Sequence, residues 1–280
     1  MPDWLIKNTV FDLTRPRIMG ILNLTPDSFS GDGLYPSRQK ALEHAFLMEK
    51  EGADIIDIGA VSTRPGSIPV SEEEELKRLM PALEEICAKT RVPVSVDTCK
   101  ARVAAEALKT GAAIINDITA GKDRRILELA AENKSGLVLM HMQGTPATMQ
   151  ENPSYRDVIA EIRQFLAEKI AEAKKSGVSE EQIVIDPGIG FGKTPEHNLT
   201  ILKRLNDFAE LSRPILVGPS RKAFIGKITG LAVNERLEGT IAAVVTAYLS
   251  GGAIFRVHDV KEVKRALAIA EAIKNANPGN

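Results

Sequence analysis

The sequence predicts one (β/α)8 TIM barrel: a single domain over residues 1–280, with residues 1–16 as an N-terminal lead-in. Short runs rich in Ile and Val alternate along the chain with longer segments of helical period. Most of these runs are apolar throughout, as expected for parallel strands that are buried on both faces. No linker rich in Pro, Gly or Ser divides the chain, and a barrel of this kind commonly takes about 250 residues. A doubly wound open sheet is the structural alternative.

Eight runs are expected to form the strands, and amphipathic helices are expected between them. The strands are predicted at residues 17–22, 54–58, 92–96, 112–115, 137–140, 183–185, 214–217 and 253–257. In residues 155–174 and 235–249, apolar side chains recur at steps of three and four residues, which gives each helix one face to cover the sheet. Ser71 followed by Glu74 predicts a capping box that opens a helix reaching Ala88.

The composition is that of an ordinary globular protein and excludes several classes of function. Lys and Arg number 36 against 37 Asp and Glu, so the net charge of -1 gives no overall basic field for nucleic acid. No apolar run approaches the roughly 20 residues that span a bilayer, and the N-terminus lacks the apolar core of a secretion signal. Two cysteines, Cys87 and Cys99, cannot build a disulfide framework. We therefore expect a cytoplasmic protein with reduced thiols and no nucleic-acid or membrane partner.

Polar side chains follow seven of the eight predicted strands, and the C-terminal ends of barrel strands are where the chemistry is expected. These positions hold Asn23, Ser62-Thr63-Arg64, Asp97, Asn116, Asp186, Ser220-Arg221-Lys222, Arg256 and His258, and Met140 follows the remaining strand. The basic residues converge on one rim only in a barrel, where they form an anion site in a neutral chain. The Asp and Asn side chains supply acceptors and an amide that suit a flat heterocycle.

Each of these residues also has an ordinary structural explanation. Asp97 and Asp186 could cap the next helix, Asn116 could be a turn residue, and Met140 could pack in the core. The glycine-rich loop at 188–194 fits neither the phosphate-loop spacing nor the dinucleotide fingerprint. No cluster has zinc-ligand spacing.

Cys99 lies two residues beyond Asp97, close enough to the rim to suggest a nucleophile. No His or Asn constellation near it in the sequence supports that function. A structural thiol is therefore favoured.

Seven short motifs, taken together, resemble the dihydropteroate synthase family. They are residues 18–30 (IMGILNLTPDSFS), 62–66 (STRPG), 94–98 (VSVDT), 115–117 (IND), 186–193 (DPGIGFGK), 218–222 (GPSRK) and 256–259 (RVHD). They run in family order across residues 17–272, which is nearly the whole chain. The resemblance implies a TIM barrel that joins 6-hydroxymethyl-7,8-dihydropterin diphosphate to p-aminobenzoate, with release of diphosphate. It also implies a Mg²⁺ ion, a homodimer and a target of sulfonamides.

The resemblance assigns roles to residues of this sequence by position. The pterin would be bound or stacked by Asp97, Asn116, Met140, Asp186, Phe191, Lys222 and Arg256. The diphosphate would be held by Asn23, Thr63, Arg64, Arg256 and His258, and Asn23 would also reach Mg²⁺. The p-aminobenzoate would contact Phe29, Ser62, Thr63, Pro65, Lys222 and Ala223. The catalytic group would be Arg64, Lys222, Arg256 and His258. In the family the C–O bond breaks early, so no strong general base is required, and two mobile loops exclude water.

Three positions depart from the family pattern. Ala223 stands where Ser often follows the lysine, so backbone N–H groups at the helix start would carry the contact to the aminobenzoate carboxylate. The first loop reads Ser-Gly-Asp-Gly over residues 30–33 in place of Ser-Asp-Gly-Gly, and Asp32 is therefore given no role. Val61 replaces a common Glu, with no firm account of its effect.

Other functions remain open on the sequence alone. A methyltransferase barrel that uses methyltetrahydrofolate and a corrinoid partner could share the Asp and Asn residues of a pterin pocket. An aldolase could use Lys222 as a Schiff base. A pterin-binding module without catalysis is a third possibility, but it would have little use for Asn23, Arg64 and His258.

Overall fold

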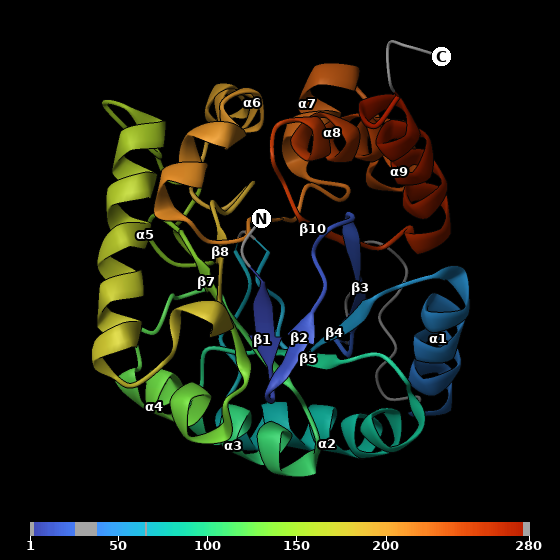
Figure 1. Cartoon of the computed structure of the whole chain (residues 1–280), viewed down its shortest axis with the longest axis vertical. Coiled ribbons are helices and arrows are strands. Elements are labelled where there is room, and N and C mark those ends of the chain that lie inside the picture. The colour runs from blue at the N-terminus through green and yellow to red at the C-terminus, as the bar shows by residue number, and fades with distance from the viewer. Residues whose placement is uncertain (1–2, 26–37, 65, 277–280) are drawn as a thin grey trace.

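The computed structural model describes residues 3–25, 38–64 and 66–276, which form a (β/α)8 TIM barrel. Eight strands are hydrogen-bonded in the order β8-β7-β6-β5-β4-β3-β10-β9. The bridge between Ile185 and Ile215, together with the 3.0 Å bond from Ile185 N to Pro214 O, joins β8 to the last edge. Helices surround the strands on all sides (Figure 1). The predicted barrel is confirmed and the open sheet is excluded.

Each of the eight predicted runs overlaps one observed strand. The barrel strands are β3 (Arg17–Asn23), β4 (Ile55–Gly59), β5 (Val94–Asp97), β6 (Ile114–Asp117), β7 (Gly136–Met140), β8 (Ile183–Asp186), β9 (Leu216–Val217) and β10 (Ile254–Val257). Several strands extend far enough to include the polar residue that the sequence placed just beyond their ends, among them Asn23, Asp97 and Asp186. The pleat of the sheet therefore decides which way these side chains point.

The helices pack outside the strands. They are α1 (Arg38–Glu51), α2 (Glu72–Lys89), α3 (Ala101–Thr110), α4 (Arg124–Asn133), α5 (Val158–Lys175), α6 (Pro195–Lys203), α7 (Ala223–Thr229), α8 (Leu237–Leu249) and α9 (Val260–Lys274), with short 3-10 turns η1 (Glu180–Gln182), η2 (Leu205–Leu211) and η3 (Val233–Glu235). Ser71 caps α2 by accepting from Glu74 N at 3.2 Å, while the Glu74 carboxylate accepts from Arg78 at 2.8 Å. Within the described ranges, no helix combines the length and apolar character needed to cross a membrane.

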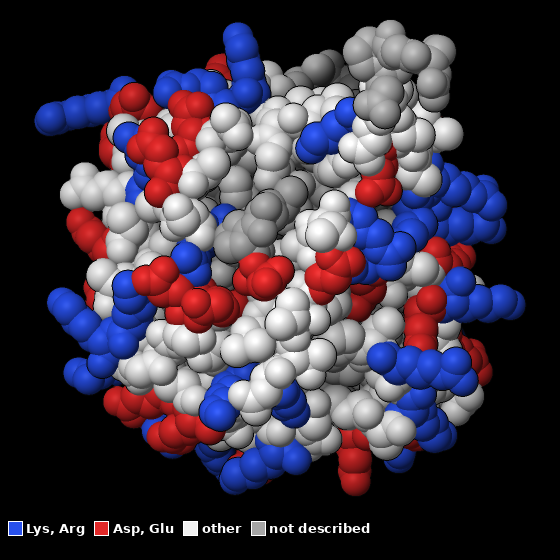
Figure 2. Space-filling model, viewed as in Figure 1, with Lys and Arg blue, Asp and Glu red and all other residues white. Residues whose placement is uncertain are grey.

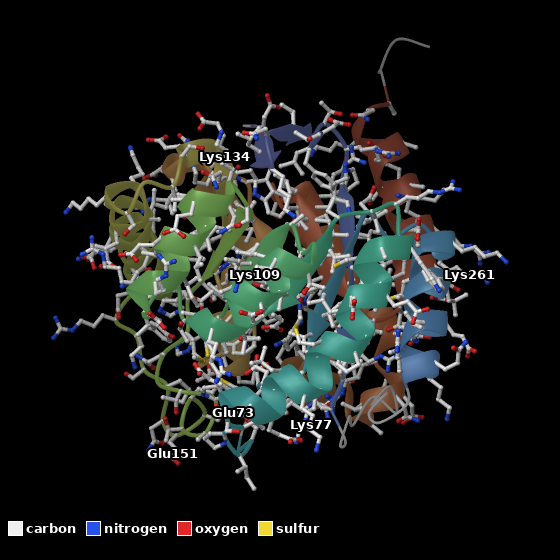
Figure 3. All side chains as sticks on the ribbon, turned by 90° about the horizontal axis from the view of Figure 1, so that it is seen from below. Glu73, Lys77, Lys109, Lys134, Glu151 and Lys261 are labelled. Carbon is white, nitrogen blue, oxygen red and sulfur yellow. The ribbon has the colours of Figure 1, made fainter. Side chains whose placement is uncertain are left out.

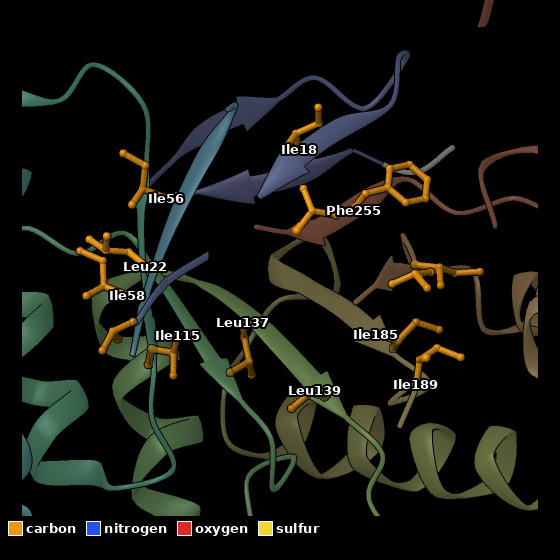
Figure 4. Packing of buried hydrophobic residues seen from close by; sticks show 14 of the residues in the cluster. Ile18, Leu22, Ile56, Ile58, Ile115, Leu137, Leu139, Ile185, Ile189 and Phe255 are labelled. Carbon is orange, nitrogen blue, oxygen red and sulfur yellow. The ribbon is translucent and has the colours of Figure 1, made fainter. Parts of the chain in front are cut away.

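Alternation along the strands separates two apolar cores. Ile56 and Ile58 of β4 belong to the large core between sheet and helices, which Figure 4 shows from close by. Ile55 of the same strand belongs to a second core inside the barrel. The members of this inner core that come from barrel strands are Met19, Ile55, Ile114, Val138, Val184, Leu216 and Ile254. The inner core fills the N-terminal half of the barrel, so a cavity can form only toward the other end.

An N-terminal hairpin closes the floor of the barrel, and it was not predicted from the sequence. Strands β1 (Trp4–Ile6) and β2 (Thr9–Phe11) are joined by Lys7 and Asn8, whose φ angles of 48° and 65° suit a tight hairpin turn. Trp4 is fully buried in the inner core, and its Nε1 donates to Gln182 O at 2.9 Å.

The two ends of the barrel are distinguished in Figure 3, where Lys134 lies beside the hairpin and Glu73 and Glu151 lie at the opposite end. On the face shown in Figure 2, acidic and basic side chains are interspersed. This distribution agrees with the near-zero net charge of the chain.

Replacing Trp4 should destabilise the barrel from its floor. Trp4→Ala removes a large ring from the inner core and leaves a cavity, so we expect the free energy of unfolding to fall by about 3–5 kcal/mol in urea denaturation. Val10→Ala on the same hairpin is the matched control, because Val10 is 58% exposed, and it should change the free energy by no more than about 0.5 kcal/mol. Equal, small losses in both variants would show that the hairpin is not part of the core.

Candidate active site

A cavity of about 560 Å³ opens at the C-terminal ends of the strands. Its lining includes most residues that the sequence singled out: Asn23, Ser62, Thr63, Arg64, Asp97, Phe191, Ser220, Lys222, Ala223, Arg256 and His258. They come from segments that lie up to 235 positions apart in the chain (from 23 to 258), and the barrel brings them together. Phe29 and Pro65 lie outside the described residues.

Three other predicted residues lie buried around the cavity. Asn116, Met140 and Asp186 belong to β6, β7 and β8, at or next to the last position of each strand, and each is at least nine-tenths buried. Asn116 is the register partner of Asp97, and Met140 is the register partner of Asp186. Register partners on parallel strands point to the same face, so these side chains all face the barrel interior near its C-terminal end, and together they are called the interior layer.

Arg256 holds two carboxylates inside this layer. Its Nε donates to Asp57 Oδ2 at 2.6 Å, and its Nη2 donates to Asp97 Oδ2 at 2.7 Å. The same Oδ2 of Asp57 accepts a bond from Asn116 Nδ2 at 3.1 Å. Asp57 is fully buried within β4. One carboxylate oxygen of Asp57 therefore links the guanidinium of Arg256 to the side-chain amide of Asn116.

Asp57 was not predicted as a site residue, although the sequence carries a signal for it. Asp57 lies in the middle of the apolar run Ile-Ile-Asp-Ile-Gly, and a charged residue there is unusual in a strand that is buried on both faces. The predicted site residues lie at strand ends or in the segments that follow them, whereas Asp57 lies two positions before Gly59, the last residue of β4.

Burial sets the charge state of Asp97. Loss of hydration raises the pKa of Asp97 to about 7, an effect that Arg256 opposes and that the neighbouring Asp57 carboxylate reinforces. Space for this carboxylate comes from Gly59 on the adjacent strand, where a Cβ atom would lie 3.3 Å from the Cβ of Asp97. The Asp97 carboxylate can therefore change its protonation state near neutral pH.

Asp186 and Lys222 form the second charged part of the site. Burial raises the pKa of Asp186 to about 6, although its Oδ1 accepts from Gly188 N at 2.7 Å and Lys222 lowers the pKa in turn. Burial and the nearby Arg256 lower the pKa of Lys222 to about 8. The Lys222 ammonium lies 4.0 Å from the centroid of the Phe191 ring. Both groups are available for hydrogen bonds to a polar ring.

The glycine-rich loop after β8 carries Phe191 into the cavity. Gly188, Gly190 and Gly192 all have positive φ, a conformation that favours glycine. Lys193 fastens the loop, because its buried ammonium donates to Phe191 O at 2.8 Å and lies 3.0 Å from His141 Nδ1. Lys193 was not among the predicted site residues.

Phe191 packs with Ile118, Met140 and Met149, so this side of the site is apolar. Burial lowers the pKa of Lys193 to about 7 and that of His141 to about 3. His141 is therefore neutral at physiological pH and can accept a bond from Lys193.

Cationic side chains also line the cavity. Ser220 Oγ lies 2.9 Å from His258 Nδ1, which orients the ring, and both residues line the cavity. Arg221 Nη2 donates to Asp259 at 2.5 Å, so this pair holds the loops after β9 and β10 together. Arg64 and Lys222 line the same cavity. The site thus combines a buried set of acceptors and donors for a flat heterocycle with a cationic rim for an anion.

Within the described part of the chain, neither the cysteines nor the metal-ligating side chains form a disulfide or a metal-binding cluster. Both cysteines are free, and burial raises the pKa of Cys87 and of Cys99 to about 11. Among the residues that the structure describes, no group of three or more His, Cys, Asp and Glu side chains could hold a metal ion.

Comparisons with known proteins agree on one family. The sequence profile described as "Pterin binding enzyme" matches residues 19–258. The dihydropteroate synthase of Escherichia coli strain K12 is 47% identical over 270 residues, which cover 96% of each chain. A crystal structure of Yersinia pestis dihydropteroate synthase with a sulfonamide drug has a TM-score of 0.95 at 42% identity, and covers 98% of this chain and 100% of that chain. The Thermus thermophilus enzyme in complex with 4-aminobenzoate has a TM-score of 0.88 at 45% identity, over 97% of this chain and 99% of that one.

The raised thiol pKa values predict slow alkylation of the folded protein. At pH 8 the thiolate fraction of a thiol with pKa about 11 is roughly a hundredfold below that of an unperturbed cysteine, so native Cys87 and Cys99 should react with iodoacetamide about a hundredfold more slowly than in urea. Mass spectrometry of timed samples measures both sites. A native Cys99 that labels as fast as the unfolded chain would support the nucleophile that the sequence disfavoured.

Proposed function

This chain belongs to the dihydropteroate synthase family of pterin binding enzymes, and from that membership we propose how the side chains around its cavity carry out the reaction. The enzyme is a transferase of folate biosynthesis. It condenses 6-hydroxymethyl-7,8-dihydropterin diphosphate with p-aminobenzoate to give 7,8-dihydropteroate and diphosphate. The observation that supports the assignment of roles is that the buried Asn116 and Asp186 share the end of the barrel with a cavity lined by polar and cationic side chains. Those lining side chains are Asp97, Lys222, Arg64 and His258.

The hydrogen-bonding groups of the interior layer match the edge of a dihydropterin in order. The ring edge presents the N3–H and 2-amino donors, then the N1 acceptor, then the N8–H donor. We assign the two adjacent donors to the carboxylate of Asp186, because an ionised carboxylate only accepts. Asn116 offers an acceptor and a donor to the 2-amino group and N1. Asp97 accepts from N8–H, and Lys222 donates to the O4 and N5 acceptors on the far side of the ring.

The faces of the pterin ring contact different groups. Met140 and Phe191 provide the apolar surface, since both belong to the cluster at the end of β7 and β8. Arg256 stacks its planar guanidinium on the ring, which is a favourable geometry for this side chain. Because Arg256 is already held by Asp57 and Asp97, little side-chain entropy is lost when the pterin arrives.

The cationic rim holds the diphosphate. Arg64 and His258 line the cavity together with Arg256, which also bonds to the interior layer, and Thr63 adds a hydroxyl. The Ser220 hydroxyl orients His258 through Nδ1, so its other ring nitrogen can face the anion. These groups stabilise the charge that develops on the leaving diphosphate as the C–O bond breaks, which lowers the barrier electrostatically.

A magnesium ion fits the oxygen chemistry at the end of β3. Asn23 lines the cavity and carries a side-chain carbonyl oxygen, and Mg²⁺ usually takes only one or two protein ligands together with substrate phosphates and water. We propose that Asn23 holds Mg²⁺ against the diphosphate. When bound, the ion supplies further neutralisation of the leaving group.

The aminobenzoate is proposed to lie at the mouth of the cavity. Ser62, Thr63, Lys222 and Ala223 line this part of it, and the family's contacts at Phe29 and Pro65 fall outside the described residues. The C–O bond to diphosphate breaks early, the aromatic amine attacks the methylene carbon of the resulting pterin-stabilised cation, and the amine proton then leaves to solvent or diphosphate. No strong general base is required, since the pterin stabilises the developing cation.

We also propose a homodimer in the cytoplasm. The dimer is the family expectation, and sedimentation of the purified chain would test it. The cytoplasmic location is supported by the two free thiols, which are typical of reducing compartments.

Turnover of the two substrates is the direct test of the proposal. Purified protein with the dihydropterin diphosphate, p-aminobenzoate and Mg²⁺ should release dihydropteroate and diphosphate in equal amounts, detected by chromatography. Pterin binding without product would instead favour a binding module, and trapping of substrate on Lys222 by borohydride would favour a Schiff-base enzyme.

Arg64→Ala should reduce turnover while the affinity for a pterin without diphosphate is unchanged, because Arg64 belongs to the anion rim.

Pterin affinity should fall as the pH is lowered from 8 to 5. Asp97, with its pKa of about 7, and Asp186, with its pKa of about 6, must both be ionised to accept from the ring, so binding below these values first releases protons. Each carboxyl group that must lose a proton weakens pterin binding by up to about tenfold for every pH unit below its pKa. Calorimetry with 6-hydroxymethyl-7,8-dihydropterin avoids the titration of a diphosphate.

The matched control is Asp186→Asn. This variant keeps an oxygen for Gly188 N but loses the charge, so its affinity should be weaker by about 1.5–3 kcal/mol and should depend less steeply on pH. An affinity for the wild-type protein that stays constant from pH 5 to 8 would contradict the roles given to both carboxylates.

A further inference from the structure

We propose that Asp57 is a positioning residue for the pterin site, which orients Asn116 and Arg256 from beneath the cavity and thereby sets the affinity for the dihydropterin substrate. Asp57 does not belong to the described lining of the cavity, and its side chain is fully buried. The inference rests on the proposed pterin-binding roles of Asn116 and Arg256. It assigns Asp57 no contact with substrate.

Asp57 fixes the direction of the Asn116 amide. An amide can present either its oxygen or its nitrogen to a given neighbour, and the two choices offer opposite hydrogen-bonding patterns to a ligand. An ionised carboxylate can only accept, so Asp57 requires the nitrogen, and Nδ2 of Asn116 lies 3.1 Å from Asp57 Oδ2. Asn116 then retains Oδ1 and its second N–H as an adjacent acceptor and donor. That order matches the 2-amino group and N1 of a pterin.

Asp57 also restrains the guanidinium of Arg256 close to its aliphatic chain. Asp57 binds Nε, the nitrogen nearest the aliphatic chain, at 2.6 Å, whereas Asp97 binds a terminal nitrogen at 2.7 Å. The contact with Asp57 therefore holds the guanidinium at Nε, next to the aliphatic chain, and so sets the orientation of the guanidinium plane. If a ligand competes for the Asp97 carboxylate, Asp57 still provides the countercharge that a buried guanidinium requires.

One carboxylate oxygen of Asp57 binds both partners. Oδ2 of Asp57 accepts from Asn116 and from Arg256, so moving either side chain disturbs the bond to the other. The two residues lie 140 positions apart in the sequence (116 and 256) and on strands that are not neighbours. Asp57 therefore connects Asn116, which is proposed to bind the edge of the pterin, to Arg256, which is proposed to stack on the face of the ring.

The fold offers a matched control at the same depth of the barrel interior as Asp57. Ser95 of β5 is the register partner of Asp57, is equally buried, and its Oγ has no hydrogen-bond partner among the described residues. Ser95→Ala thus changes a polar group at the same depth without disturbing Asn116 or Arg256. Any general effect of altering the barrel interior should appear in this control.

Asp57→Asn keeps the shape of the side chain and removes its charge. We expect the KM for dihydropterin diphosphate, and the Kd for 6-hydroxymethyl-7,8-dihydropterin, to rise at least about tenfold, as for loss of a charge-assisted bond. The KM for p-aminobenzoate should stay within about twofold of wild type. Ser95→Ala should match wild type in all three constants. Equal pterin constants for Asp57→Asn and Ser95→Ala, with both proteins folded, would overturn the proposal, as would an equal rise in both substrate KM values.

A double-mutant cycle with Asn116→Ala keeps the test decisive if Asp57→Asn is less stable. At a temperature where all variants are folded by circular dichroism, the loss of pterin affinity from Asp57→Asn should be smaller in the Asn116→Ala background, because one route of its action is already gone. Fully additive losses would contradict positioning through Asn116. Wild-type turnover is measured alongside: its absence would refute the proposed function, whereas active wild type with an unaffected Asp57→Asn variant refutes only the role of Asp57.

Discussion

The site depends on one guanidinium shared between two buried carboxylates. Asp57 and Asp97 lie close enough to repel each other at the end of the barrel, and Arg256 offsets that repulsion by bonding to both. Removing one member of such a group leaves an uncompensated buried charge, which is strongly destabilising. The arrangement therefore keeps acceptors for a ligand in place while no ligand is bound. Asp186 is likewise stabilised by nearby cations, because Lys193 and Lys222 both favour its ionised form.

The barrel places stability and chemistry at opposite ends. Trp4 and the inner core fill the N-terminal end with apolar side chains, while the layer that contains Asp97 and Asn116 faces the open end. The rigid strands hold these polar groups at fixed separations. The loops around them add the cationic rim, where Arg64 and His258 meet the anionic part of a substrate. Recognition of the ring is thus built into the sheet, and recognition of the diphosphate is carried mainly by loops.

The sequence was enough to predict the barrel, because apolar runs at regular spacing suit strands buried on both faces. It also predicted most of the cavity lining, since polar residues at strand ends meet on one rim when a barrel closes. The N-terminal hairpin was missed because its three-residue strands are stable only when Trp4 enters the barrel. Asp57 was missed because it lies before the end of β4, and its partner Arg256, 199 positions away, reaches it only when the barrel closes. Residue types can be read locally, but the pairing of buried charges requires the tertiary structure.

Asp57 is proposed to hold Asn116 and Arg256 in the orientations that a pterin requires, and a crystal structure of the protein with bound 6-hydroxymethyl-7,8-dihydropterin would test this. In that complex Asp57 should keep both hydrogen bonds, Asn116 should turn its oxygen toward the 2-amino group, and the Arg256 plane should lie over the ring. A bound pterin with Asn116 and Arg256 both displaced from Asp57 would show that the proposed positioning is wrong.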